Sequence, residues 1–132
     1  EYNVRFGDPE TQTILPLLKS TGAENDWCSV LKAVSEGRVP VLQWRKEAVA
    51  CIVLAAEGYP DQPVKGVEIQ LPTLHQLPPG VQVLHAGTRR QGEKFVTNGG
   101  RVLNVVARDA TLPQALEKAY QAVSLIRWTG MQ

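Results

Sequence analysis

The sequence predicts an α+β fold, in which a small antiparallel sheet is covered by one packed helix and is preceded by a helical N-terminal part. Three observations support this prediction. Apolar residues recur at helical spacing in the first third of the chain, short apolar runs divided by turn residues fill the middle, and a second helical stripe lies near the end. Consecutive strands backed by a terminal helix are typical of an α+β domain.

The chain has 132 residues, of which 43% are hydrophobic and 20% are charged, so it can bury one core, or one core and an appended subdomain. Its net charge of +1 is dispersed and forms no basic stripe for nucleic acid. The longest apolar run, Ala48 to Ala56, is far shorter than the roughly 20 residues that cross a bilayer, and the sequence shows no signal peptide. We therefore expect a cytoplasmic protein that binds neither nucleic acid nor membrane.

The first six residues alternate polar and apolar side chains, which predicts a strand. Glu1, Asn3 and Arg5 would then project from one face of it. A carboxylate and an amide oxygen at this spacing suit a hard divalent cation such as Mg²⁺, and Arg5 beside them suits a phosphate or a carboxylate. The same alternation is typical of the solvated face of any half-buried strand, so the pattern leaves both interpretations open.

A helix is predicted to begin at Pro9. Asp8 suits the N-cap, Pro9 the first helical position, and Glu10 the first turn, where a carboxylate meets the positive end of the helix dipole. Pro16 should kink this helix or break it into two short helices, because proline removes a hydrogen-bond donor from the helix interior.

A second amphipathic helix is predicted to follow, opened by Asn25 or Asp26 and closed by Gly37. Its apolar positions recur at i, i+3, i+4 and i+7, and they are Trp27, Val30, Leu31 and Val34.

From about Trp44 the pattern changes to strands and turns. The unbroken apolar run Ala48 to Ala56 is expected of a central strand that is covered on both faces. Turn residues fill positions 57–63. Two further strands are predicted near Val67 to Leu71 and from Val81 to His85, and a proline-rich connection joins them.

Asn98, Gly99 and Gly100 lie between two predicted strands, 95–97 and 101–106. Because Asn and Gly tolerate positive φ, this triplet is a strong signal for a hairpin turn, and the flanking strands are expected to pair. A phosphate cradle formed by the two glycines is the alternative, although no strand-to-helix junction follows them.

The last helix is expected after Thr111, which suits the N-cap, with Gln114 completing a capping box. Its buried stripe should consist of Leu112, Ala115, Leu116, Ala119, Val123 and Ile126.

Cys28 and Cys51 are the only cysteines, and neither belongs to a CxxC pair. Each lies in an apolar pattern, so we expect two buried, reduced and inert thiols, with a disulfide or a catalytic thiol as the alternatives. His85 has no carboxylate or cysteine near it in the sequence, which favours a structural hydrogen-bonding histidine over a general base.

Six short segments occur in an order that indicates a family. The chain opens on EYNVRFGDPETQ and continues with LPLLKS, GYP, KG, HAGT and TNGGRVL, which lie at residues 1–12, 15–20, 58–60, 65–66, 85–88 and 97–103. Together they closely resemble phosphoribosylamine-glycine ligases, also called glycinamide ribonucleotide synthetases, which are ATP-grasp enzymes of purine synthesis. The resemblance spans nearly the whole chain.

The resemblance implies a division into two parts. Residues 1–43 would be the C-terminal end of the ATP-grasp catalytic domain, and residues 44–132 the C-terminal α+β domain. The family's chains are several times longer, and their ATP-binding portions precede the position that Glu1 occupies here. We therefore expect a C-terminal portion whose partner is the missing N-terminal portion of the same protein, and which is inactive alone. The alternative is a docking module that completes a ligase site in trans.

The resemblance also implies a reaction and its site. ATP would phosphorylate glycine, and 5-phosphoribosylamine would attack the glycyl phosphate to give glycinamide ribonucleotide, with Mg²⁺ or Mn²⁺ as cofactor. Glu1 and Asn3 match the family's metal ligands, and Arg5 could contact a phosphoryl or carboxylate oxygen. Lys65 could contact a substrate phosphate, with a solvated loop lysine as the alternative. Pro63 and Val64 stand where the family carries an aromatic residue before its KG.

Overall fold

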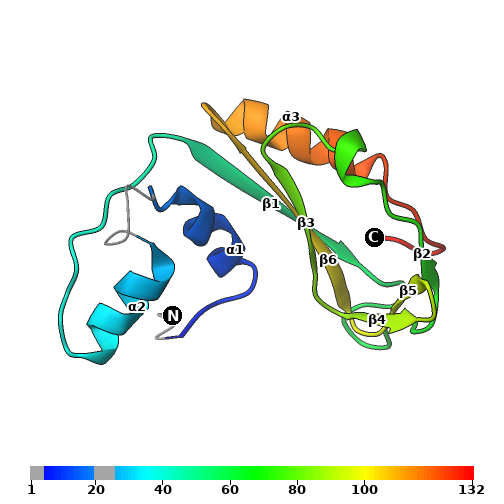
Figure 1. Ribbon diagram of the computed structural model, residues 1–132. Coiled ribbons are helices and arrows are strands. Elements are labelled where there is room, and N and C mark those ends of the chain that lie inside the picture. Colours follow the sequence, from blue (N-terminus) through cyan, green and yellow to red (C-terminus); the bar gives the residue numbers. More distant parts are fainter. Residues whose placement is uncertain (1–4, 20–25) are drawn as a thin grey trace.

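The computed structural model describes residues 5–19 and 26–132, and within them a helical N-terminal part precedes two small antiparallel sheets and a last helix (Figure 1). The N-terminal part contains α1 (Glu10–Ile14), the 3-10 helix η1 (Leu15–Leu17) and α2 (Trp27–Ser35). The elements that follow are β1 (Ala48–Ala55), β2 (Glu68–Ile69), the 3-10 helix η2 (Leu74–Gln76), β3 (Val81–His85), β4 (Thr88–Gln91), β5 (Lys94–Thr97), β6 (Arg101–Asp109) and α3 (Leu112–Val123).

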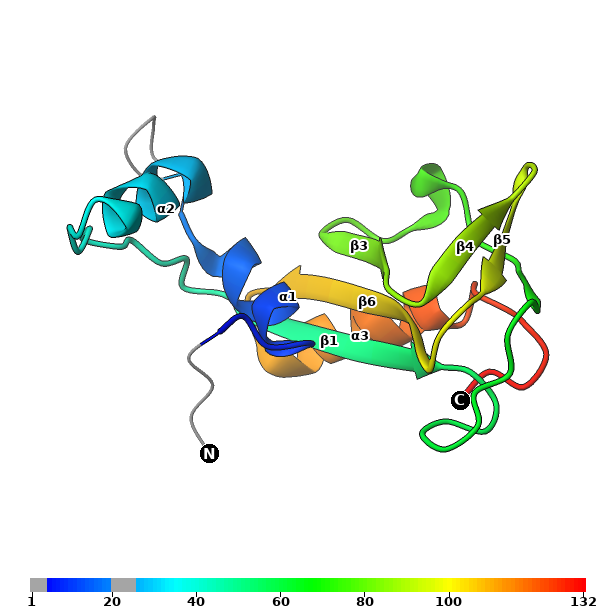
Figure 2. The ribbon, with the colours of Figure 1, turned by 90° about the horizontal axis from the view of Figure 1, so that it is seen from below.

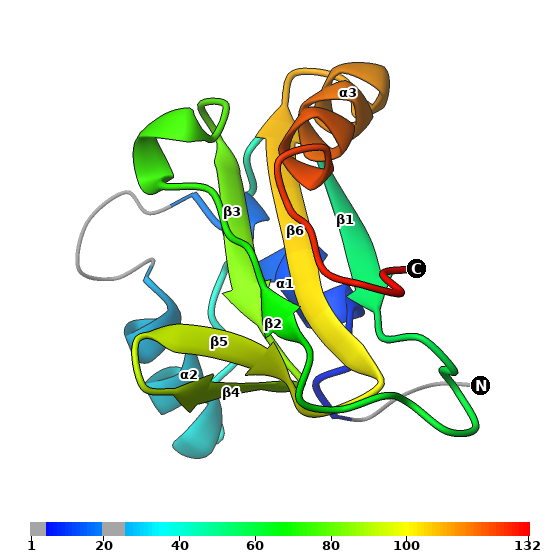
Figure 3. The same ribbon diagram turned by 90° about the vertical axis from the view of Figure 1, so that its right-hand side faces the viewer.

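The main sheet has the order β1-β6-β3, and both pairings are antiparallel. Figure 2 shows α3 on one face of this sheet and α1 on the other. The core lies between the sheet and α3, where the fully buried side chains include Leu103, Val105 and Ile126. The smaller sheet, β2-β5-β4, gathers at one end of the main sheet, as Figure 3 shows. The predicted α+β class is confirmed.

The prediction that the run Ala48 to Ala56 forms a central strand is wrong. It forms β1, which is an edge strand of the main sheet, while the central strand is β6. The predicted cover on both faces is confirmed, because α3 packs against one face of β1 and α1 against the other. Cover on both faces therefore removes the polar alternation from an edge strand as well.

The predicted hairpin at Asn98 to Gly100 is also wrong. β5 pairs with β4 and β2, whereas β6 belongs to the main sheet, so residues 98–100 carry the chain from one sheet to the other. The hairpin lies earlier, where Gln91 faces Lys94 across Gly92 and Glu93, and Gly92 has φ of 62°. Turn residues thus indicate where the chain bends and leave its strand partners undetermined.

The first helix begins one residue later than predicted. Pro9 occupies the N-cap of α1, and no side chain caps the helix. Asp8 is therefore not the cap; one of its carboxylate oxygens accepts a hydrogen bond from Gln12 Nε2 at 2.6 Å. The break at Pro16 is confirmed, because the helix tightens there into η1.

The second helix follows its prediction at both ends. Asp26 is the N-cap of α2 and accepts a hydrogen bond from the Ser29 N–H at 2.9 Å, and Gly37 has φ of 73° just beyond the C-terminus. The apolar stripe is only partly covered among the described residues, since Val30 is buried but Val34 is 57% exposed.

The last helix begins after Thr111 as predicted, but without the predicted capping box. The Thr111 hydroxyl donates to Gln114 Oε1 at 2.8 Å and caps no backbone N–H group. Leu112 is exposed, contrary to the predicted stripe, and the helix meets the sheet through three buried small residues, Ala115, Ala119 and Ala122. Small side chains allow a helix axis to approach a sheet closely.

An ion pair joins α3 to the central strand and gives stability a pH dependence. Lys118 Nζ lies 2.6 Å from Asp109 Oδ2, and this hydrogen bond, followed by one from the Ala110 N–H, holds the pKa of Asp109 below its ordinary value. Because the folded state lowers this pKa, the stabilisation is present above the unfolded pKa of about 4 and is lost as pH falls through the folded pKa.

We predict that Asp109→Asn lowers the melting temperature at pH 7 and that its difference from wild type shrinks as pH falls below the ordinary carboxyl pKa of about 4 and disappears below the lowered folded pKa. Thermal unfolding between pH 2 and 8 measures this. Glu117→Gln is the matched control, since Glu117 is an exposed carboxylate of α3 with no ion pair among the described residues. A pH-independent difference for Asp109→Asn would contradict the assignment.

Candidate functional site

The residues predicted to form the site lie at two places, and the structure describes only some of them. Glu1 and Asn3 lie outside the described residues. Arg5 and Lys65 are both exposed. Within residues 5–19 and 26–132, no three His, Cys, Asp or Glu side chains form a cluster that could hold a metal ion.

Arg5 lies on the segment that leads into α1. Its Nη1 donates to the carbonyl oxygen of Phe6 at 3.1 Å, which leaves further guanidinium donors for another acceptor. It also lines a hollow of about 270 Å³, whose other walls come from Phe6, Gly7, Glu10, Thr11, Ile14, Leu15 and Trp27. A donor at the rim of a mostly apolar hollow can orient an anionic group there.

Lys65 lies in a loop whose backbone is fixed. The Gly66 N–H donates to the carbonyl oxygen of Thr97 at 2.7 Å, and the Val64 N–H donates to that of Glu57 at 2.9 Å. The fully buried Thr97 hydroxyl also donates to the Val64 carbonyl at 3.0 Å. A cation on a fixed loop is suited to binding an anion. Lys65 makes no hydrogen bond or ion pair within the described residues.

Three of the segments that indicated the family meet at one corner of the fold. The Gly87 N–H donates to the carbonyl of Arg101 at 2.8 Å, and the Asn98 N–H donates to that of Gly87 at 2.8 Å. A Cβ atom at Gly87 would lie 2.8 Å from Gly99 Cα, so the two chain segments cross with no room for a side chain. Tyr59 covers Gly100 in the same corner.

The corner is joined to the start of α1 by Arg101. Its Nη1 donates to the backbone carbonyl of Asp8 at 2.5 Å and lies 3.7 Å from the Asp8 carboxylate. Sequence reasoning assigned no role to Arg101, although it belongs to the TNGGRVL segment. The contact brings this segment to the one that contains Arg5.

His85 is the hydrogen-bonding histidine that the sequence predicted. Its Nδ1 lies 2.9 Å from the Thr88 hydroxyl, and its ring packs on Phe95 with centroids 4.4 Å apart. These contacts connect β3 to the β4-β5 hairpin.

The two thiols differ from each other. Cys51 is half-buried and lies 3.8 Å from Asn104 Oδ1, and burial, followed by the Asp8 carboxylate, raises the pKa of this thiol. A raised pKa favours the unreactive thiol form, as predicted. Cys28 is exposed on α2, so its predicted burial is wrong, and the apolar pattern around it does not extend to its own position.

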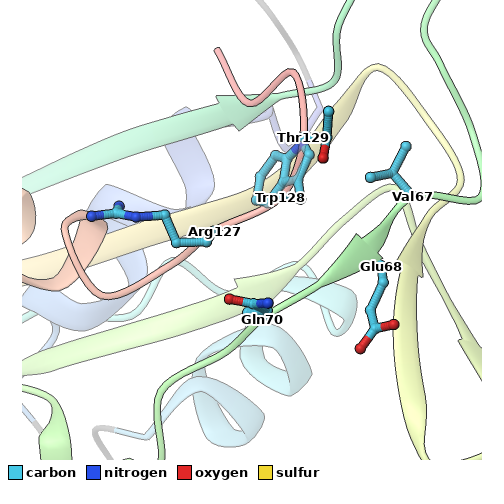
Figure 4. Close-up of a pocket in the computed structure, with 6 residues that line it drawn as sticks. All are labelled: Val67, Glu68, Gln70, Arg127, Trp128 and Thr129. Atoms are coloured by element: carbon cyan, nitrogen blue, oxygen red, sulfur yellow. The ribbon is translucent and has the colours of Figure 1, made fainter.

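A separate hollow of about 440 Å³ lies between β2 and the C-terminal segment (Figure 4). Gln70 and Arg127 exchange backbone hydrogen bonds at its wall, at 2.8 and 3.1 Å, and the Glu68 carboxylate is paired with Lys94 at 2.8 Å. None of the residues that the sequence predicted for the site lines this hollow.

No helix among the described residues has the length and apolar character required to cross a membrane.

A family model described as the C domain of phosphoribosylglycinamide synthetase matches residues 49–132. This chain belongs to the phosphoribosylglycinamide synthetase family. The match covers the sheets, α3 and the corner that contains Arg101.

Synthetase relatives match along almost the entire chain. The phosphoribosylamine–glycine ligase of Halalkalibacterium halodurans is 43% identical over 131 residues, which are 99% of this chain and 29% of the relative. The chloroplastic ligase of Arabidopsis thaliana is 42% identical over 134 residues, which are 98% of this chain and 24% of the relative. The chain thus spans less than a third of the length of these relatives.

A solved synthetase structure has the same fold. The crystal structure of phosphoribosylamine–glycine ligase from Thermotoga maritima is 35% identical to this chain and superposes with a TM-score of 0.80. The superposition covers 100% of this chain and 31% of that one.

We predict that Gly100→Ala destabilises the fold by about 1–3 kcal/mol, because the new methyl group would collide with the ring of Tyr59. Gly100 has no positive φ, so the backbone itself accepts alanine. In a Tyr59→Ala background the cost of the same substitution should largely disappear. A double-mutant cycle by urea unfolding measures this coupling, and equal costs in both backgrounds would show that the ring is not responsible.

Proposed function

We propose that this chain is the C-terminal part of a ligase that joins glycine to 5-phosphoribosylamine with ATP as co-substrate. The observation that carries the proposal is the contact between Arg101 and Asp8, which joins the family's TNGGRVL segment to the segment of Arg5. The names of the relatives, phosphoribosylamine–glycine ligase, support the choice of reaction.

In the proposed reaction the glycine carboxylate attacks the γ-phosphorus of ATP, and ADP leaves. The amine of 5-phosphoribosylamine then attacks the carbonyl carbon of the glycyl phosphate, and phosphate leaves to give glycinamide ribonucleotide. A divalent cation, when bound, neutralises the charge of the transferred phosphoryl group. We assign Mg²⁺ or Mn²⁺ to Glu1 and Asn3, whose carboxylate and amide oxygens are donors of the class that such hard cations prefer.

Arg5 is proposed to contact a phosphoryl or carboxylate oxygen. The guanidinium is exposed, and within residues 5–19 and 26–132 only its Nη1 is engaged, by the Phe6 carbonyl, which supports this role. A planar cation of this kind can bind two oxygens of such a group at once.

Lys65 is proposed to contact the phosphate of the ribosylamine substrate. Its exposure and the fixed backbone of its loop support the proposal. Pro63 and Val64 replace the family's aromatic residue in the loop beside it.

The N-terminal part of the chain presents an apolar surface that suits the upstream portion of such a ligase. Its large exposed apolar side chains, from the segment before α1 through α2 to the connection before β1, are Phe6, Ile14, Leu31, Val34, Val39, Val41 and Trp44. Large apolar side chains exposed in this number indicate an interaction surface. We propose that the partner is the N-terminal portion of the ligase and that this chain alone is inactive. We also propose that the ligase is cytoplasmic.

The test is a chimera in which this chain replaces the matching C-terminal part of the Halalkalibacterium halodurans ligase. Phosphate release from ATP, dependent on glycine and freshly generated phosphoribosylamine, is expected from the chimera and not from this chain alone. Mixing this chain with the separately expressed upstream part distinguishes a docking module, which would restore activity without covalent linkage. A folded chimera without ligase activity would overturn the proposed function.

We predict that Glu1→Ala or Asn3→Ala in the chimera lowers turnover and raises the Mg²⁺ concentration that gives half-maximal activity, by about tenfold or more. The melting temperature should change little, because each residue acts on the metal. Glu117→Ala is the control, since it removes an exposed carboxylate of α3 that does not line the hollow beside Arg5. An unchanged Mg²⁺ dependence in both variants would dismiss the metal assignment.

A further inference from the structure

We propose that Arg101 is a positioning residue for the ligase site, which it serves by fixing the backbone of the segment from Arg5 to Asp8. This proposal rests on the proposed function. Arg101 itself is not assigned to the substrates. It acts through the carbonyl of Asp8, three residues after Arg5.

A β-bulge gives Arg101 the direction that this role requires. Leu54 pairs with Leu103, but the next residue of β1, Ala55, pairs with Arg101, so β6 has one extra residue at this point. Without that residue, regular alternation would turn Arg101 toward α3. The bulge instead places it opposite Ala55, on the face of the sheet that α1 covers.

A second arginine of β6 faces the same side and provides a comparison. Arg108 pairs with Val49, and positions 49 and 55 lie on the same face of β1. Arg108 Nη1 lies 3.4 Å from the carbonyl oxygen of Pro16, and its Nε lies 2.8 Å from Glu47. The central strand therefore holds the α1-η1 segment at both ends, with Arg101 at the end nearer Arg5.

The contact of Arg101 is suited to local positioning more than to global stability. The two side chains are 40% and 46% exposed, so water screens their charge interaction. The short hydrogen bond to the Asp8 carbonyl is directional, and the preceding Gly7 carbonyl accepts from the Thr11 N–H at 3.1 Å. Two consecutive carbonyls are thus held, which fixes the chain where it leaves Arg5.

Small displacements of a residue that contacts the reacting groups have large effects on the reaction rate. A misplacement of about 1 Å can cost on the order of 100-fold in rate, even when it begins away from the reacting atoms. Loss of Arg101 should therefore affect catalysis far more than folding.

The first measurement is amide hydrogen exchange in the active chimera, for Arg101→Gln, Arg101→Lys and the matched control Arg108→Gln. Arg101→Gln should accelerate exchange in the peptide that contains residues 6–12 by about tenfold or more. Arg101→Lys retains a donor for the Asp8 carbonyl and should restore much of the protection. Arg108→Gln should leave this peptide protected, because its contacts lie at Pro16 and Glu47.

The second measurement is steady-state kinetics of the same proteins. Arg101→Gln should lower kcat/KM for glycine by roughly 10-fold to 100-fold and raise the Mg²⁺ requirement, with Arg101→Lys intermediate and Arg108→Gln near wild type. Melting temperatures check that all variants remain folded.

The outcomes separate this proposal from the one on which it rests. An inactive wild-type chimera contradicts the proposed function. An active chimera in which Arg101→Gln loosens the 6–12 peptide but leaves kinetics unchanged overturns the positioning role, because the contact would then be merely structural. Equal kinetic losses in Arg101→Gln and Arg108→Gln overturn it too, since the effect would not depend on proximity to Arg5.

Discussion

The pairing of β6 with a neighbour on each side is the interaction on which the rest of the structure depends. Residues 102–107 of this strand are all almost completely buried, and both β1 and β3 take their register from it. One face of the resulting sheet receives α3, and the other receives α1, which contacts β1. Arginines at the two ends of β6 contact the backbone on either side of α1, at Asp8 and Pro16. The strand thus organises the hydrophobic core and also contacts the N-terminal segment through Arg101 and Arg108.

Much of the fold could be predicted from local patterns, because helices, strands and turns each have their own spacing and end signals. The break at Pro16, the cap at Asp26 and the start of α3 are examples. Strand partners could not be predicted in this way. The triplet at 98–100 specifies a bend, but a bend between sheets and a bend within a hairpin use the same residues, and only the crossing near Gly87 decides between them.

The candidate site was less accessible to sequence reasoning. The proposed roles of Glu1, Asn3, Arg5 and Lys65 rest mainly on resemblance, since their spacing alone also fits a solvated strand or loop. The contact of Arg101 with Asp8 joins residues far apart in sequence, and a one-residue bulge decides which way Arg101 points. Asp8 looked like a helix cap because its residue type is suited to one, yet its carbonyl and carboxylate serve other donors.

The place of β6 in the chain also has a consequence for biosynthesis. β1 is translated first, and four other strands leave the ribosome before the central strand that pairs with it. During that interval the apolar run of β1 has no native partner in its sheet, and pairings so distant in sequence are slow to form. The main sheet therefore assembles only after β6 has been translated. A nascent chain that stalls before β6 exposes the apolar residues of β1, which chaperones can bind.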